Sequence, residues 1–292
     1  MSEASQQTSH RPSLRPTLWE GVLAVALLLA MTPTWIELSK VWQRYDYYSH
    51  GFLVPIAALW AATAQRGKLP RLPRERSLVG GLLLGVGLCL NLMGSLAVIV
   101  SLQGVSLVLC VAGAVWFARG TAWAKCLAFS ISYLIFMVPV PEGWITPLIA
   151  RLQLFVSATA IPLVNALGIA AEREGNVMWL PDGESLFVAE ACSGITSILT
   201  LIPLAVFLAW FTQSRLSRRA WLVVAVVPLA MAGNLLRVAI TVGVAHYHSI
   251  EMATGETLHN LAGIATYVVG CLALLAIGRA MDRFAPLPKA RA

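Results

Sequence analysis

Long apolar segments follow one another along the 292-residue chain, with only short polar stretches between them. An apolar run of about 20 residues is long enough to cross a bilayer as a helix. Charged residues make up 12% of the chain, roughly half the 25% that is typical of soluble domains. We therefore expect an all-α polytopic membrane protein with about eight spans. The predicted spans cover residues 18–38, 52–64, 78–96, 97–117, a fifth segment ending near 140, 192–211, 220–241 and 261–277.

Basic residues are concentrated in short polar stretches, and their distribution orients the chain. Cytoplasmic loops of membrane proteins are enriched in Lys and Arg. If the N-terminus is cytoplasmic and the proline-interrupted segment 145–170 is interfacial or re-entrant, 16 of the 21 basic residues lie inside. This arrangement predicts that both termini are cytoplasmic and that the polar stretches 40–50, 142–190 and 246–259 face outward. The net charge of +7 then reflects membrane topology, which argues against nucleic-acid binding.

The apolar runs predict a single membrane domain over residues 18–279. A cytoplasmic N-terminal tail, 1–17, precedes it, and a basic cytoplasmic tail, 280–292, follows it. Within the outer stretch, Pro181-Asp182-Gly183 is a turn signal between two short apolar runs. We therefore expect a small β-hairpin-like loop near 172–190.

Cys192 differs from the other four cysteines, which lie inside apolar runs. It lies where the outer stretch becomes a predicted span, and Ser193 and Gly194 follow it. A helix N-terminus carries partial positive charge and unpaired amides, both of which favour a thiolate nucleophile. Cys192 could equally be a small buried side chain. Ser193 and Gly194 fit either a backbone that a substrate approaches or an ordinary helix start.

Arg237 lies within the predicted span 220–241, near its outer end, and Asn234 lies one turn earlier on the same helix face. A charged side chain within a membrane is costly and usually faces a polar cavity. Snorkelling of the guanidinium to the outer headgroups would account for Arg237. It would not account for Asn234, so the pair favours a functional interpretation.

His259 begins the last predicted span. Histidine is the usual general acid–base near neutral pH, although at a membrane boundary it is commonly a plain interfacial residue. A metal site formed with His246, His248 and Glu251 is an alternative, but the spacing matches no strong zinc signature. We therefore expect no metal and no cofactor.

Cys192, Arg237 and His259 come from three different predicted helices, each at its outer end. A nucleophile, a proton carrier and a cation that can stabilise an oxyanion are the groups that acyl transfer requires. The charge-based topology thus brings together, on one side of the membrane, the components of a cysteine-dependent acyl-transfer site.

Five short motifs resemble those of the exosortase/archaeosortase family of membrane transpeptidases or proteases. Residues 191–195, Ala-Cys-Ser-Gly-Ile, are similar to its nucleophile motif, residues 234–238 to its arginine motif and residues 258–260 to its histidine motif. Residues 48–55, which include His50, resemble its early outer-loop signature, and residues 136–141 its mid-chain proline motif. The motifs occur in family order, and the resemblance covers nearly the whole chain.

The resemblance implies a multi-pass protein of the bacterial inner membrane whose active site faces the periplasm. Cys192 would cleave C-terminal PEP-CTERM-like sorting signals through a thioester, with His259 as acid–base and Arg237 stabilising the oxyanion or the thiolate. Ser193, Gly194, Asn234 and His50 would contact the substrate or support the site; for His50 the two roles fit equally well.

The implied partners are membrane-anchored proteins that carry such a signal, a transmembrane helix and a basic tail. The acyl group would pass to water or to an acceptor amine on a surface glycan or lipid, in protein sorting linked to exopolysaccharide export.

The main alternative is a non-enzymatic membrane transporter or a polysaccharide-export subunit. A transporter would be expected to show paired half-sequence repeats and broken helices near the bilayer midplane, and neither is evident here. A metal-dependent intramembrane protease that uses His246, His248 and His259 is a further alternative.

Overall fold

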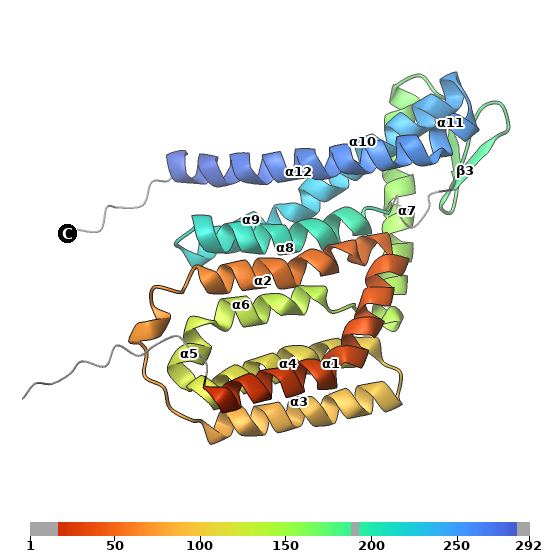
Figure 1. Ribbon diagram of the computed structural model, residues 1–292. Coiled ribbons are helices and arrows are strands. Elements are labelled where there is room, and N and C mark those ends of the chain that lie inside the picture. Colours follow the sequence, from red (N-terminus) through yellow and green to blue (C-terminus); the bar gives the residue numbers. More distant parts are fainter. Residues whose placement is uncertain (1–16, 188–192, 285–292) are drawn as a thin grey trace, which may run out of the picture. The chain divides into compact units, whose positions relative to one another are not determined.

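The computed structural model describes residues 17–187 and 193–284, without the side chains of residues 256–260, 282 and 284. It divides the chain into two compact units. The first unit comprises Met1–Tyr45 and Ser49–Val140, and the second comprises Asp46–Tyr48 and Pro141–Ala292. Helices dominate the described part of both units (Figure 1).

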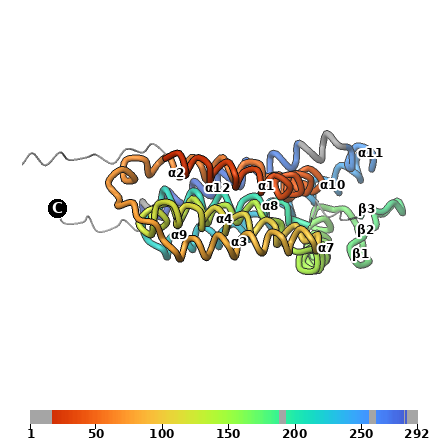
Figure 2. Tube along the Cα trace, turned by 60° about the horizontal axis from the view of Figure 1, so that its bottom comes forward, coloured from red at the N-terminus to blue at the C-terminus, as the bar shows by residue number. Residues whose placement is uncertain are grey.

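The described part of the chain before residue 141 forms helices and turns without a strand. Its elements are α1 (Leu18–Arg44), η1 (Asp46–Phe52), α2 (Leu53–Thr63), η2 (Leu69–Arg71), α3 (Leu78–Leu96), α4 (Val100–Arg119), α5 (Thr121–Cys126), α6 (Ala128–Tyr133) and η3 (Leu134–Met137). In the first unit, α3 and α4 lie side by side in both views (Figures 1 and 2).

Glycines on α3 allow α4 to approach closely. Gly80, Gly87 and Gly94 are buried and seven residues apart, so they lie on one helix face. A Cβ atom built on Gly87 would lie 3.0 Å from the backbone nitrogen of Cys110, and one built on Gly94 would lie 3.0 Å from that of Gln103. Small residues at helix contacts are typical of membrane helices, whose backbones gain packing by close approach.

The first helix, α1, is joined to α4 by a partly buried ion pair. Glu20 lies in the first turn of α1 and Arg119 at the end of α4. The Nε and Nη2 atoms of Arg119 lie 2.5 Å and 2.8 Å from the two carboxylate oxygens of Glu20. Pro33 lies inside α1, which bends along its length (Figure 1). Proline is a common cause of such a bend because it removes one helical hydrogen bond.

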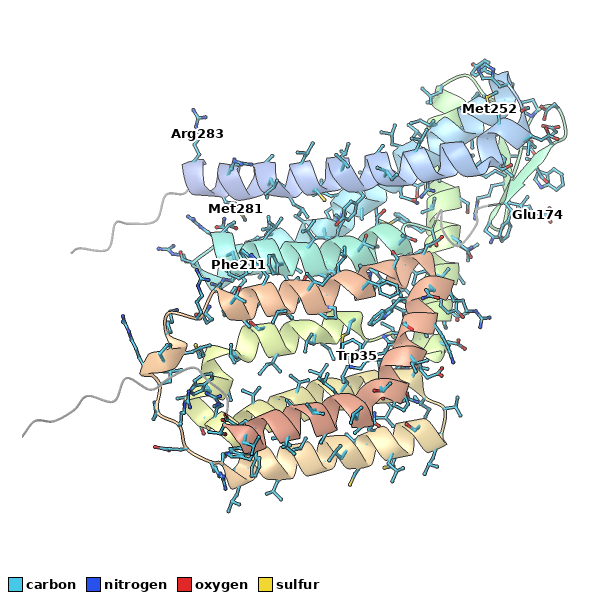
Figure 3. All side chains as sticks on the ribbon, viewed as in Figure 1. Trp35, Glu174, Phe211, Met252, Met281 and Arg283 are labelled. Carbon is cyan, nitrogen blue, oxygen red and sulfur yellow. The ribbon has the colours of Figure 1, made fainter. Side chains whose placement is uncertain are left out.

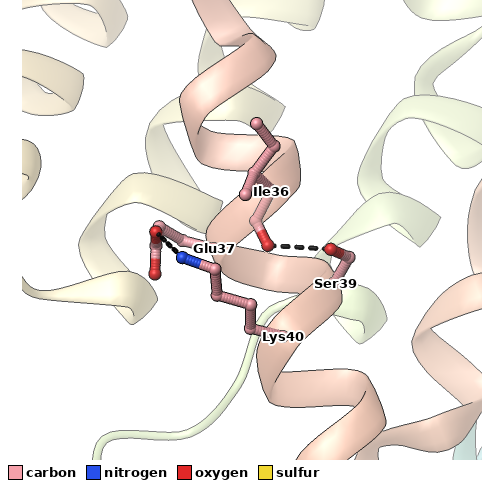
Figure 4. Close-up of polar contacts among 4 residues, drawn as sticks. All are labelled: Ile36, Glu37, Ser39 and Lys40. Atoms are coloured by element: carbon pink, nitrogen blue, oxygen red, sulfur yellow. Dashed lines mark hydrogen bonds and ion pairs between the residues drawn. The ribbon is translucent and has the colours of Figure 1, made fainter.

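The second half of α1 extends further than the apolar run predicted. Lys40 pairs with Glu37 at 2.7 Å, and the Ser39 hydroxyl donates a hydrogen bond to the carbonyl of Ile36 at 2.8 Å (Figure 4). These local contacts suit a helix, and α1 continues to Arg44. The first residues of the predicted outer stretch 40–50 are therefore helical.

The second unit contains helices and one small sheet. Its elements are α7 (Glu142–Ala166), β1 (Glu172–Glu174), β2 (Val177–Trp179), β3 (Ser185–Phe187), α8 (Ile195–Thr212), α9 (Leu216–Val224), α10 (Val226–Tyr247), α11 (Ile250–Thr254) and α12 (Glu256–Phe284). Helices α8, α10 and α12 pack against one another. In Figure 1, α7 runs across the direction of α8 and α12.

The sheet confirms the predicted hairpin and adds a strand to it. Its strand order is β1-β2-β3, and both pairs are antiparallel, with Met178 opposite Arg173 on one side and Leu186 on the other. Gly183 adopts a φ of 83° in the predicted turn between β2 and β3. The predicted loop extended to residue 190, and its last residues, 188–190, lie outside the described part.

The fold class is confirmed, but the set of long helices differs from the predicted spans. Seven helices in the described part are long and apolar enough to cross a membrane: α1, α3, α4, α7, α8, the continuous α9–α10 segment and α12. The predicted span 52–64 forms only the 11-residue helix α2, and the one ending near 140 forms the short apolar stretch Ala128–Met137.

Segment 145–170 was expected to be broken, and this was wrong for most of its length. Residues Glu142–Ala166 form one helix of 25 residues with Pro147 and Pro162 inside it. Neighbouring turns continue past each proline, since a proline removes a single hydrogen bond and bends a helix more often than it ends one. Because α7 is also long and apolar enough to cross a membrane, the interfacial or re-entrant path of this segment stays a prediction.

Candidate active site on α8, α10 and α12

The start of α8 has a glycine N-cap that directly follows the predicted nucleophile and a buried serine in the sequence. Gly194 caps the helix with a φ of 86°, a left-handed conformation that glycine adopts without a steric penalty. Ser193 is fully buried, and its hydroxyl accepts a hydrogen bond from the amide of Ile195 at 3.3 Å. Cys192 immediately precedes Ser193 in the sequence and lies outside the described residues.

Gly194 faces Asn234 of α10. A Cβ atom built on Gly194 would lie 3.5 Å from Asn234 Cβ and Cγ and 3.3 Å from Met231 Sδ. Asn234 is 1% exposed, although it lies in a helix apolar enough to span a membrane. A buried amide is costly unless it forms hydrogen bonds, so the position of Asn234 beside the cap of α8 indicates a polar environment there. The structure thus brings together Ser193, Gly194 and Asn234, which the sequence analysis selected separately.

Arg237 lies one turn after Asn234 and faces α12. Only 8% of Arg237 is exposed. A Cβ atom built on Gly263 would lie 3.9 Å and 4.0 Å from its two terminal guanidinium nitrogens. The lack of a side chain at Gly263 therefore leaves room beside the charge. This burial is inconsistent with an arginine that simply snorkels to the headgroups.

Asn234 and Arg237 of α10 lie, along the helix, between the buried residues of two apolar cores of the second unit. One core contains Val226 and Ala230 of α10 together with residues of α8, α9 and α12. The other contains Val238 and Val242 of α10 together with α7, the sheet and α11. Asn234 and Arg237 thus lie along α10 between the buried residues of the two cores, at a level where the partly buried Met231 and Leu235 pack against the second core.

His259 belongs to α12, four residues before Gly263. Positions four apart share a helix face, so position 259 lies on the face whose next turn meets Arg237. The side chain of His259 lies outside the described part. Helices α10 and α12, to which Arg237 and His259 belong, nevertheless pack against each other and against α8, which begins three residues after Cys192 in the sequence.

His50 lies in the first unit, where it contacts the proline motif. Its Nε2 atom lies 3.1 Å from the carbonyl oxygen of Phe136. Trp42 Nε1 donates a hydrogen bond to the neighbouring carbonyl of Met137 at 2.9 Å, and Gly51 leaves room for the Trp42 indole. The two motifs, 48–55 and 136–141, are far apart in the sequence, but the contact between His50 and Phe136 makes them neighbours in the fold. This contact supports a structural role for His50.

The metal alternative gains no geometric support from the described residues. Among them, no group of three or more His, Cys, Asp or Glu side chains is close enough to hold an ion. The His246 ring lies edge-on to Tyr247, with 4.8 Å between the ring centroids.

Two residues near the site were missed by the sequence analysis. Gly263 and Met231 border Arg237 and Gly194, respectively. Gly263 had a usable signal, since it lies one turn after His259 in an apolar helix, where glycine marks a close approach. Met231 had none, because a methionine in an apolar run is indistinguishable from other core residues.

A comparison with protein families identifies the family of the chain. The model of the transmembrane exosortase family matches residues 42–276, from the end of α1 to the last turns of α12. No curated protein and no solved structure matches the chain. The fold defines a multi-pass membrane protein. The chain belongs to the transmembrane exosortase family.

Proposed function

We propose that this protein is a membrane cysteine transpeptidase or protease that cleaves C-terminal PEP-CTERM-like sorting signals. The observation that carries the proposal is the packing of α8, α10 and α12, in which Gly194 borders Asn234 and Gly263 borders Arg237. Membership of the exosortase family supports the same class of reaction. Arg237 of α10, His259 of α12 and Cys192, which precedes α8 by three residues, would supply the groups that acyl transfer needs.

In the first half-reaction, the Cys192 thiolate attacks the carbonyl carbon of the scissile peptide bond. The negative charge that develops on the carbonyl oxygen is stabilised by the Arg237 guanidinium. His259 then protonates the departing amine as the C–N bond breaks, which leaves a thioester on Cys192. Burial of Arg237 strengthens its electrostatic effect, because little water competes for the oxyanion.

In the second half-reaction, His259 removes a proton from an acceptor that attacks the thioester. The acceptor is water in hydrolysis, or an amine on a surface glycan or lipid in ligation. The tetrahedral intermediate collapses, releases the Cys192 thiolate and frees the substrate. Asn234 would orient the backbone at Gly194, which lies directly beside it.

The proposal also includes the side of the membrane on which the reaction takes place. The positive-inside rule places the basic turn between α8 and α9 in the cytoplasm. The start of α8 then faces the periplasm across the bacterial inner membrane. A substrate with its own transmembrane helix and basic cytoplasmic tail would be held in the same membrane, which presents its scissile bond at the outer side.

Substrate processing in cells tests the proposal. A tagged protein with a PEP-CTERM-like signal is co-expressed with wild-type enzyme, Cys192→Ala or Cys192→Ser, and substrate size and enzyme abundance are followed on gels. Cys89→Ala is the matched control, because Cys89 is an exposed cysteine on α3. We expect both Cys192 variants to leave the substrate uncleaved at normal abundance and Cys89→Ala to cleave it. Cleavage by both Cys192 variants would reject the cysteine mechanism.

A further inference from the structure

A small pocket with both polar and apolar residues in its lining lies in the second unit, among α8, α9 and α12. Its volume is about 160 Å³, roughly five times the 30 Å³ that a water molecule occupies in the liquid. It can therefore hold a small polyatomic group, not a whole lipid. Its lining consists of Leu208, Thr212, Gln213, Leu222, Leu274, Leu275, Gly278 and Arg279.

Gln213 gives this pocket its chemical character. The residue is 2% exposed, and neither Oε1 nor Nε2 has a hydrogen-bond partner among the described residues. A Cβ atom built on Gly278 would lie 3.8 Å from Nε2, so the absence of a side chain there leaves space beside the amide. A buried amide without partners is destabilising, and a ligand with both a donor and an acceptor would offset this cost.

The backbone around Gln213 is held independently of its side chain. Arg219 Nε donates a hydrogen bond to the carbonyl oxygen of Gln213 at 2.7 Å, and the Arg219 guanidinium lies 4.4 Å from the centre of the Trp210 ring. Thr212, also in the lining, uses its hydroxyl to bind the carbonyl of Leu208. These contacts fix the turn between α8 and α9 and leave the Gln213 amide available to a ligand.

The pocket lies at the basic end of the second unit. Figure 3 shows Phe211, Met281 and Arg283 at this end and Glu174 and Met252 at the opposite end. The described basic residues around the turn and the end of α12 are Arg215, Arg218, Arg219, Arg279 and Arg283. Basic pockets between membrane helices on the cytoplasmic side are typical sites for anionic lipid headgroups.

We propose that this pocket binds the headgroup of an anionic, hydroxyl-bearing phospholipid of the phosphatidylglycerol type. The Arg279 guanidinium and Gln213 Nε2 supply donors for the phosphate oxygens, and Gln213 Oε1 accepts a hydrogen bond from a headgroup hydroxyl. Phosphatidylcholine fits less well, because its headgroup has no donor for Oε1 and no net negative charge. This inference is independent of the reaction at Cys192.

Lipid titration of the full-length protein tests the proposal. Thermal unfolding in detergent is followed as phosphatidylglycerol, phosphatidylcholine or inorganic phosphate is added, since a ligand that binds the folded state raises Tm with concentration. Gln213→Met keeps the side-chain volume but removes the amide, and Arg279→Gln removes the charge. Arg283→Gln is the matched control: it removes an exposed arginine of α12 that does not line the pocket.

We expect phosphatidylglycerol to stabilise the wild-type protein more than phosphatidylcholine. Loss of a hydrogen bond to a charged group should weaken its apparent affinity about tenfold in Gln213→Met and in Arg279→Gln. Arg283→Gln should bind like wild type. The proposal would be overturned if phosphatidylglycerol raised the Tm of all four proteins equally. It would also be overturned if the two lipids raised the Tm of the wild-type protein equally. If inorganic phosphate alone gave the full increase in Tm, the proposal that the ligand is a lipid headgroup would be overturned.

Discussion

Two pairs of glycines, Gly87 and Gly94 in the first unit and Gly194 and Gly263 in the second, face neighbouring helices but meet different chemical groups. In the first unit, Gly87 and Gly94 of α3 face the backbone of α4 at contact distance. In the second unit, Gly194 faces the Asn234 side chain, and Gly263 faces the guanidinium of Arg237. The first arrangement brings two helices together, whereas the second leaves space around buried polar groups. A glycine that faces a buried polar side chain therefore has a different structural role from one that faces the backbone of a neighbouring helix.

We expect the two pairs of glycines to affect different properties, namely the stability of the protein in the first unit and its activity in the second. Changes at the α3–α4 contact should lower the amount of folded protein and leave the activity of each remaining molecule unaltered. Changes around Asn234 and Arg237 should have the opposite effect, with normal abundance and reduced activity. Substrate processing divided by enzyme abundance measures the difference directly.

The largest effect is expected from Arg237→Ala. Loss of one oxyanion-stabilising group costs about 10²–10³ in turnover in other acyl-transfer enzymes. Processing per molecule should fall by a similar factor, and Arg237→Lys should restore only part of it, because an ammonium lacks the planar fork of the guanidinium. Initial rates of substrate cleavage at matched abundance provide the measurement. Turnover near the wild-type rate in Arg237→Ala would remove Arg237 from the chemistry.

Gly194→Ala should have the next largest effect. A left-handed conformation costs a residue with a Cβ atom about 1–2 kcal/mol, and the new methyl group would lie 3.3 Å from Met231 Sδ. The adjacent segment that carries Cys192 should shift, and a misplacement of about 1 Å can reduce a rate about a hundredfold. Processing rates at matched abundance again measure this. Wild-type turnover would show that the cap geometry of α8 is not needed.

Gly87→Leu should act on abundance instead. A Cβ atom at this position would lie 2.7 Å from Cys110 Sγ, so α3 and α4 would have to separate. Overpacking of a tight contact costs about 1–3 kcal/mol, which should lower Tm and the yield of membrane-inserted protein. Processing per remaining molecule should match wild type. Normal yield with impaired turnover would contradict the distinction between the two sets of glycines.

Gly263→Ala should have the smallest effect. The added methyl group would lie 3.9 Å from the nearest guanidinium nitrogen of Arg237, which is ordinary van der Waals contact. Turnover should change by less than about twofold, as for substitutions that create no clash or buried unsatisfied group. Gly263→Leu is the paired variant, because its longer side chain would intrude on the guanidinium and should slow processing at normal abundance. Equal activity of the two variants would show that the space beside Arg237 is not used.

The fold class could be predicted because apolar run length is a local property of the sequence. Runs that coincide with single helices, such as α3 and α8, were placed almost to their ends. Segment 145–170 was misjudged because its prolines resemble breaks, while the structure continues the helix past both. The run 52–64 was placed to within one residue of the ends of α2, but its 11 residues make a helix shorter than the roughly 20 residues of a typical membrane span.

The candidate site was only partly accessible from the sequence. Residue chemistry and motif order selected Cys192, Arg237 and His259, but local patterns carry no information on contacts between distant helices. The adjacency of Gly194 to Asn234 and of Gly263 to Arg237 depends on packing among α8, α10 and α12. The same holds for His50 and Phe136, which are 86 residues apart in the sequence.

Capture of the acyl-enzyme tests the central claim most directly. The full-length protein is incubated briefly with a peptide that carries a PEP-CTERM-like signal, quenched in acid and mapped by mass spectrometry. We predict that the acyl fragment is attached to Cys192 through a hydroxylamine-sensitive thioester, with none on Cys89, Cys110, Cys126 or Cys271. Turnover of the peptide by Cys192→Ala, with no adduct on Cys192 of the wild-type protein, would contradict the account.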